Sequence, residues 1–166
     1  MKAIKEALLE AMEDYFNVDT RRINHARKVT EYAEELLPLE NGDYPIIIGA
    51  SVLHDIGIHQ AEKKYGSTAG KYQEKEGPPI ACQILTRLKF GPDQIEEICK
   101  IIAHHHSPGK IKTQNFKILY DADWLVNLVD EYDIQDRNTL SSIIDKVFLT
   151  PSGKTRAREL YLQEKD

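Results

Sequence analysis

The stretch Ile46-Ile-Ile-Gly-Ala-Ser-Val-Leu-His-Asp-Ile56 decides the fold, because it is apolar on almost every side until its histidine–aspartate pair. A helix that is hydrophobic all round is typical of the centre of a protein. The small residues at positions 49–51 would let neighbouring helices pack closely against it. The stretch therefore predicts a fully buried central helix whose end carries His54 and Asp55.

The segments before this stretch have the periodicity of amphipathic helices, in which apolar residues recur about every 3.6 positions. One helix is expected over residues 2–16. A second is expected to begin after the N-cap candidates Asp19 and Thr20 and to run until Leu37, before Pro38. The inward stripe of this second helix would contain Arg22, His25, Ala26, Val29, Ala33 and Leu36.

The segments after the stretch begin with a polar region, residues 57–76, which has no convincing apolar face and is expected to be an irregular loop. Pro78 fits the first turn of the next helix, which would continue to about Phe90. Further helices are expected over residues 93–105, 116–131, 139–149 and 152–164. Because no segment alternates as a β-strand does, the predicted fold class is all-α, a compact orthogonal helical bundle.

The composition is that of an ordinary globular protein, with 41% hydrophobic and 30% charged residues in a chain of 166. One domain spanning residues 1–166 is expected at this length. The net charge of −5 argues against a coat for nucleic acids or an anionic membrane surface. It leaves a nucleotide substrate open, because a bound metal inverts the local field.

The two cysteines, Cys82 and Cys99, lie in helical patterns and form no CxxC pair, so they are expected to be buried free thiols in a reducing compartment. The first residues lack the apolar core of a signal peptide, and no apolar stretch approaches the ~20 residues of a membrane span. A cytoplasmic protein is therefore expected.

Histidine and aspartate side chains recur on the predicted inner helix faces, and together they suit a divalent metal. His25 lies on an inward stripe, and His54–Asp55 ends the buried helix. Asp123 shares a helix face with Asn127 and should border the core, whereas Asp121 should turn outward. Each residue alone also fits a structural role: a hydrogen-bonded core histidine, an imidazole at a helix C-terminus, or an exposed helical acid.

The ordered set His25, His54–Asp55 and Asp123 resembles the HD-domain superfamily, a group of metal-dependent phosphohydrolases. The segment Ala122-Asp123-Trp124-Leu125 matches the Ala-Asp-x-Leu context of the closing ligand in that superfamily. The resemblance covers about residues 20–130. It implies one divalent cation (Mn, Mg, Fe, Co or Ni) that is held by His25, His54, Asp55 and Asp123.

Three consecutive histidines at positions 104–106 suggest a second metal site. His105 and His106 are in phase with the apolar stripe of their helix, whereas His104 is not, although a solvated helix end also explains the run. Superfamily members with two metals resemble this arrangement, but they carry a further histidine near the start of the preceding helix. Here Glu76 is closest to that position, as a ligand or as the general base.

The substrate would be a nucleotide or another small phosphoester, by the resemblance alone, with activated water attacking phosphorus. Lys63 and Lys64 in the expected loop, together with Arg22, would bind or neutralise its phosphate, and Lys64 would thereby assist catalysis with Asp55 and Glu76. Asn127 would border the same site. Trp124 is expected to be a core or interface residue rather than a base-stacking platform.

Two alternatives remain open from the sequence. Some HD-domain proteins are di-iron oxygenases with additional histidines, which His105 and His106 would supply. A non-catalytic module that binds a nucleotide is the other alternative. In each case the partner is a small molecule rather than nucleic acid or a membrane, and a homo-oligomer is left open.

Overall fold

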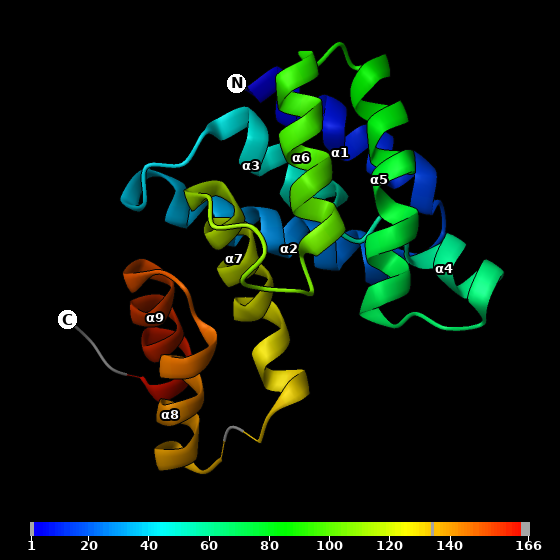
Figure 1. The fold of residues 1–166 in the computed structure, drawn as a ribbon. Helices are drawn as coiled ribbons and strands as arrows, with labels where there is room; N and C mark the ends of the chain where they lie inside the picture. Colours follow the sequence, from blue (N-terminus) through cyan, green and yellow to red (C-terminus); the bar gives the residue numbers. More distant parts are fainter. Residues whose placement is uncertain (1, 134, 164–166) are drawn as a thin grey trace.

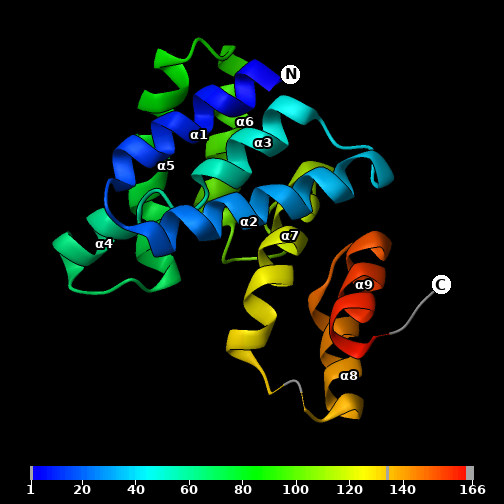
Figure 2. The same cartoon turned by 180° about the vertical axis from the view of Figure 1, so that it is seen from behind.

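The centre of the molecule is helix α3 (Tyr44–Leu53), in which every residue from Ile46 to Leu53 is buried. It contacts α1 (Lys2–Phe16), α2 (Thr20–Leu36), α6 (Pro92–His104) and α7 (Gln114–Glu131), which surround it in Figures 1 and 2. A Cβ atom at Gly49 would lie 2.6 Å from Ile98 of α6, so the close packing expected of the small residues is real. The central buried helix is therefore confirmed.

The computed structural model describes residues 2–133 and 135–163, and within these ranges it contains helices and no β-strand. The predicted all-α fold class is confirmed. Asp19 caps α2 as expected, because its side chain accepts a hydrogen bond from the Arg22 amide at 3.3 Å. Pro38 ends α2 in a 3₁₀ turn, Leu37–Leu39. No helix among the described residues is long and apolar enough to cross a membrane.

The segment expected to be an irregular loop is instead mostly helical. It contains α4 (Ile58–Tyr65) and the first turns of α5 (Gly70–Arg87), so Pro78 lies inside a helix and not at its start. Tertiary packing overrides the local signal: a Cβ atom at Gly57 would lie 2.4 Å from the Gly77 amide nitrogen, so the turn after α3 rests directly on α5.

The C-terminal helices pack against α7 at one end of the molecule (Figure 1). They are α8 (Arg137–Val147), α9 (Pro151–Ala157) and a π-helical turn, Arg158–Leu162. The expected helices over 139–149 and 152–164 correspond to them, although residue 164 lies outside the described residues. In Figure 2, α8 and α9 lie to one side of the helices around α3. Helix α9 contacts both α7 and α2, where the Arg156 guanidinium pairs with Glu35 at 2.8 Å.

Asp121 does not turn outward as expected. Its side chain is fully buried and accepts hydrogen bonds from the Leu149 amide at 2.8 Å and from the Thr150 amide and hydroxyl at 2.8 and 2.6 Å. Burial raises the pKa of Asp121 to about 6, against the effect of these donors. The C-terminal helices cover this face of α7, which the periodicity of α7 alone cannot show.

The cysteines are free, as predicted, but Cys82 is exposed on α5 and Cys99 is only partly buried on α6. Burial, with a smaller contribution from Cys82, raises the pKa of the Cys99 thiol to about 11. The expectation of two buried thiols is wrong because Cys82 lies on the outer face of α5.

We expect Asp121→Ala to lower the free energy of unfolding by about 1–3 kcal/mol, because the buried Thr150 amide and hydroxyl lose their acceptor. Urea denaturation followed by circular dichroism measures this loss. Asp130→Ala, at an exposed position of the same helix, is the control and should change stability by less than about 0.5 kcal/mol. Equal stability of the two variants would show that Asp121 does not hold the C-terminal helices.

Candidate metal centre

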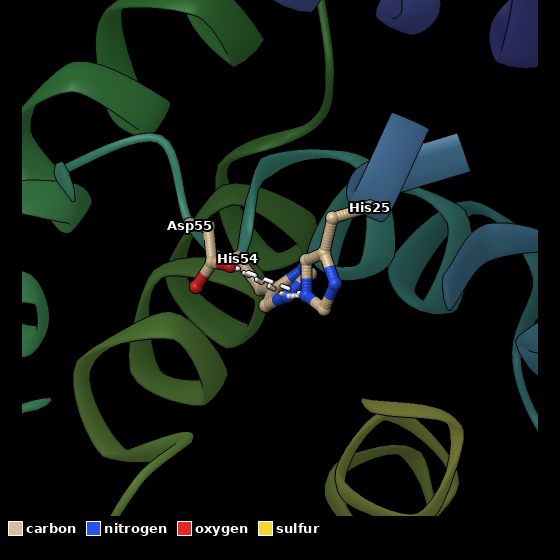
Figure 3. A group of neighbouring side chains, drawn as sticks. All are labelled: His25, His54 and Asp55. Carbon is tan, nitrogen blue, oxygen red and sulfur yellow. Dashed lines mark hydrogen bonds and ion pairs between the residues drawn. The ribbon is translucent and has the colours of Figure 1, made fainter. Parts of the chain in front are cut away.

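Four side chains, from α2, from α7 and from the turn that follows α3, meet at the end of α3. The His25 Nε2 atom, from α2, lies 3.2 Å from His54 Nε2, 3.3 Å from Asp55 Oδ2 and 3.1 Å from Asp123 Oδ1. His54 Nε2 lies 3.4 Å from Asp55 Oδ2 and 3.3 Å from Asp123 Oδ1. Figure 3 shows the His25 imidazole reaching from α2 toward His54 and Asp55. The structure thus brings the four predicted ligands together.

The orientation of His54 leaves a lone pair facing this group. Its Nδ1–H donates to the Ser51 carbonyl oxygen at 2.7 Å, because a carbonyl can only accept. The Nε2 atom of the neutral ring therefore carries a lone pair, and it faces the carboxylate oxygens of Asp55 and Asp123. Lone pairs and carboxylates at these distances repel each other unless a proton or a metal ion lies among them.

The negative charges of the Asp55 and Asp123 carboxylates also favour a positive charge at this site. Burial opposes the charged form of His54, yet the Asp55 and Asp123 carboxylates outweigh it and raise the His54 pKa well above its usual value. Burial likewise opposes ionisation of Asp55, but His54 and His105 hold its pKa well below the usual range. A divalent cation satisfies both carboxylates and both lone pairs at once, so the residues present fit a metal.

A second group of candidate ligands adjoins the first. Asp55, His105 and His106 offer ligand atoms that all lie within 4.8 Å of one another. His105 Nδ1–H donates to the Ile102 carbonyl at 2.6 Å, which leaves Nε2 bare, 3.3 Å from Asp55 Oδ1. This buried nitrogen has no hydrogen-bond partner in the described part of the chain. Asp55 directs Oδ2 to His25 and His54 and Oδ1 to His105, so it is a candidate ligand in both groups.

The sequence predicted that His105 and His106 point inward and that His104 does not; His105 and His104 agree with this prediction, and His106 does not. His105 is buried, with 2% of its surface exposed. His104 Nδ1 bonds to the Lys100 carbonyl on its own helix at 2.9 Å and so turns away from the group. His106 is exposed rather than inward, although its ring centroid lies 4.0 Å from that of His105.

Glu76, which we expected to be a ligand of a second metal or the general base, is instead paired with Tyr65 and Lys64. It accepts a hydrogen bond from the Tyr65 hydroxyl at 3.1 Å and lies 3.6 Å from the Lys64 ammonium, between α4 and α5. Glu74 instead accepts from the His106 amide at 3.1 Å, and Gln73 Oε1 lies 3.4 Å from His106 Nε2. The sequence predicted the wrong residue of α5 next to the histidines. Helix α5 begins at Gly70, before its prolines, and the face with Gln73 and Glu74 meets His106.

A cleft of about 550 Å³ opens beside the metal centre. Its α2 wall carries Arg21, Arg22 and Lys28, and its α7 wall carries Asn127, Asp130 and Glu131. Asn127 also donates to Asp123 Oδ1 at 2.9 Å and so orients a candidate ligand. Arg22 and Asn127 thus lie where the sequence predicted.

The basic residues of the cleft differ in part from those expected. Lys63 and Lys64 are exposed on α4, outside the set of residues that line the cleft. Arg21 and Lys28 were missed, although both lie about one turn from His25 on α2 and could have been found from that helical spacing. Gln73 was missed because it lies in the segment expected to be a loop.

Comparisons with known proteins show which family the chain resembles. A comparison with curated proteins found no match. A predicted HD superfamily hydrolase from an uncultured Thermotogales bacterium shares 26% identity with a TM-score of 0.67, covering 98% of this chain and 86% of that one. An HD-superfamily hydrolase from Bacillus thuringiensis has the same fold, with 18% identity and a TM-score of 0.66 over 98% of this chain and 92% of that one.

The family model for the HD domain matches residues 22–128, which include His25, the His54–Asp55 pair and Asp123. These residues meet at one site, in a fold shared with two HD-superfamily structures. The resemblance seen in the sequence is confirmed, and the chain belongs to the HD-domain family.

Proposed function

We propose that the protein is a metal-dependent phosphohydrolase that acts on a small phosphoester, nucleotides included. The observation that carries the proposal is the pairing of bare imidazole nitrogens with ionised carboxylates beside a cleft with arginines on one wall. His25, His54, Asp55 and Asp123 would hold one divalent cation, and Asp55, His105 and His106 would hold a second. The name of the Thermotogales protein, a predicted HD superfamily hydrolase, supports the hydrolase part of this proposal.

A divalent cation in this site supplies Lewis acidity, which activates water and withdraws charge from a phosphoryl oxygen. The protein supplies position and charge. The Ser51 and Ile102 carbonyls fix the tautomers of His54 and His105, and Asn127 holds Asp123. These contacts keep the ligands ready without reorganisation during the reaction.

The arginines of α2 bind the phosphoryl group from the other side. Neither Arg21 nor Arg22 is ion-paired within the described part of the chain, so both guanidinium groups are free to meet non-bridging oxygens. Water attacks phosphorus, the ester P–O bond breaks, and the alcohol leaves with a proton. Lys64 and Glu76 neutralise each other between α4 and α5, so the proposal uses neither of them.

A di-iron oxygenase is the second candidate, and it is favoured by the position of Asp55 between two groups of histidines. Oxygen consumption that requires two bound irons would select it over hydrolysis. Binding of a nucleotide without phosphate release under every metal would select a non-catalytic module.

We expect metal-stripped protein to release phosphate from p-nitrophenyl phosphate or nucleoside monophosphates only after Mn, Mg, Fe, Co or Ni is added, because the ligands alone provide no Lewis acid. A phosphate-release screen of each substrate with each metal measures this. Full activity in the presence of a strong chelator would contradict the proposal.

We expect Asp55→Asn to abolish most of this activity and to lower the bound metal per chain, because it removes a negative charge shared by both candidate sites. Metal analysis of the dialysed protein gives a readout that does not depend on turnover. Asp14→Asn, at an exposed position of α1, makes the same charge change and should retain metal and activity. A variant at Asp55 that kept both would show that the pair is structural.

We expect His105→Ala to lower phosphate release by roughly tenfold or more, because its bare Nε2 points at Asp55, whereas His104→Ala should have little effect. Initial rates at saturating metal measure both variants. A larger loss in the His104 variant would mean that the end of α6 is rotated relative to the structure.

A further inference from the structure

A second cavity, of about 200 Å³, adjoins the metal centre on the side of α7. We call it the aromatic cavity; its walls are His105, His106, Tyr120, Asp123, Trp124, Asn127 and Glu131. It shares His106, Asp123, Asn127 and Glu131 with the main cleft. A molecule that reacts beside Asp123 can therefore extend into the aromatic cavity.

Two rings on one face of α7 form the walls of this cavity, and each has a second ring against it. Phe116 stacks on Tyr120 with centroids 5.8 Å apart, and Tyr132 stacks on Trp124, also at 5.8 Å. These contacts hold the two wall rings in place before a ligand arrives, which reduces the entropy lost on binding. Trp124 packs against the hydrophobic core, in line with the expectation of a core or interface residue, and it also forms part of the cavity wall.

Asp123, His105 and His106 on the wall of the aromatic cavity are candidate metal ligands, and the charged side chain of this wall beyond them is the carboxylate of Glu131. Glu131 lies at the boundary shared with the main cleft, and no cation is ion-paired with it in the described residues. Aromatic faces carry negative charge as well, so a ring pair with a carboxylate attracts an ammonium group and repels an anion. The opposite wall of the cleft, on α2, carries Arg21 and Arg22 and attracts anions. The two walls therefore orient a zwitterion.

We propose that the aromatic cavity binds a cationic ammonium group, so that the substrate is a small phosphoester of an amino alcohol or a quaternary ammonium alcohol. The phosphoester half of this statement rests on the proposed function. The cationic half rests on Tyr120, Trp124 and Glu131. In this proposal the phosphate of the substrate faces the candidate metal centre and α2, and its ammonium group lies between the rings of Tyr120 and Trp124.

Trp124 is the sole tryptophan of the chain, so its fluorescence reports directly on the cavity, without metal and without turnover. We expect choline to change the fluorescence of metal-free protein saturably. The neutral isostere 3,3-dimethylbutan-1-ol should bind about tenfold more weakly, because it has the same shape without the charge. Equal affinity for the two compounds, or no response to choline, would overturn the proposal. Tighter binding of adenosine than of choline would overturn it in favour of a nucleobase.

Glu131→Gln should weaken choline binding by about fivefold to tenfold and leave binding of the neutral isostere unchanged, because only the charge of the cavity differs. Glu62→Gln, at an exposed position of α4, makes the same change of net charge and is the matched control. Circular dichroism confirms that both variants are folded. If the two variants weakened choline binding equally, the effect would be one of net charge and the cavity assignment would be wrong.

Turnover separates this inference from the proposed function. With the metal-loaded enzyme, kcat/KM for O-phosphocholine should exceed that for 3,3-dimethylbutyl phosphate by about tenfold. Equal values with robust phosphate release would overturn the cationic subsite and leave the hydrolase in place. Selective choline binding with no phosphate release from any ester would overturn the hydrolase and leave the subsite in place.

Discussion

The arrangement of the helices around the site depends on one constraint: the poorly solvated carboxylate of Asp55, at the end of α3, needs positive or hydrogen-bonding partners. The helix is buried because its residues are apolar on all sides, and it carries His54 and Asp55 to a place with little solvent, where the Asp55 side chain is 12% exposed and His54 is not exposed. A buried carboxylate has to be compensated, since its desolvation costs several kcal/mol. The surrounding helices supply His25 and His105 for it, together with a second carboxylate, Asp123. This arrangement brings two carboxylates and three imidazoles together, a set of side chains that suits a divalent cation.

The geometry around Asp55 also explains why the site has two halves. One carboxylate oxygen faces His25 and His54, and the other faces His105. Both imidazoles at the ends of α3 and α6 are held by carbonyl oxygens of their own helices, three residues back, as the free carbonyls of a helix C-terminus allow. Two helix ends therefore orient ligands in the same way, and Asp55 lies between them.

The cleft has a direction, because its walls come from helices of different character. The N-terminal half of α2 presents arginines toward the metal centre, and the C-terminal half of α7 presents carboxylates and an aromatic cavity. A ligand with a single kind of charge would be attracted by one wall and repelled by the other. The polarity of the cleft is consequently a better guide to the substrate than its volume.

The local sequence was sufficient for the helical fold class, the burial of α3 and the choice of four candidate ligands that meet at one site, because each depends on periodicity or on a short motif. It was insufficient where distant segments decide the outcome. Helix α5 begins before its prolines and packs through Gly77 against Gly57 of the turn after α3, and Asp121 is buried because the turn before α9 covers it. Both contacts join residues that are far apart in the chain. The tertiary structure alone decided that Gln73 and Glu74, rather than Glu76, meet His106, and that Trp124 forms the wall of a cavity. The physical reason is that a helix presents several faces, and only the packing of its neighbours determines which face meets the site.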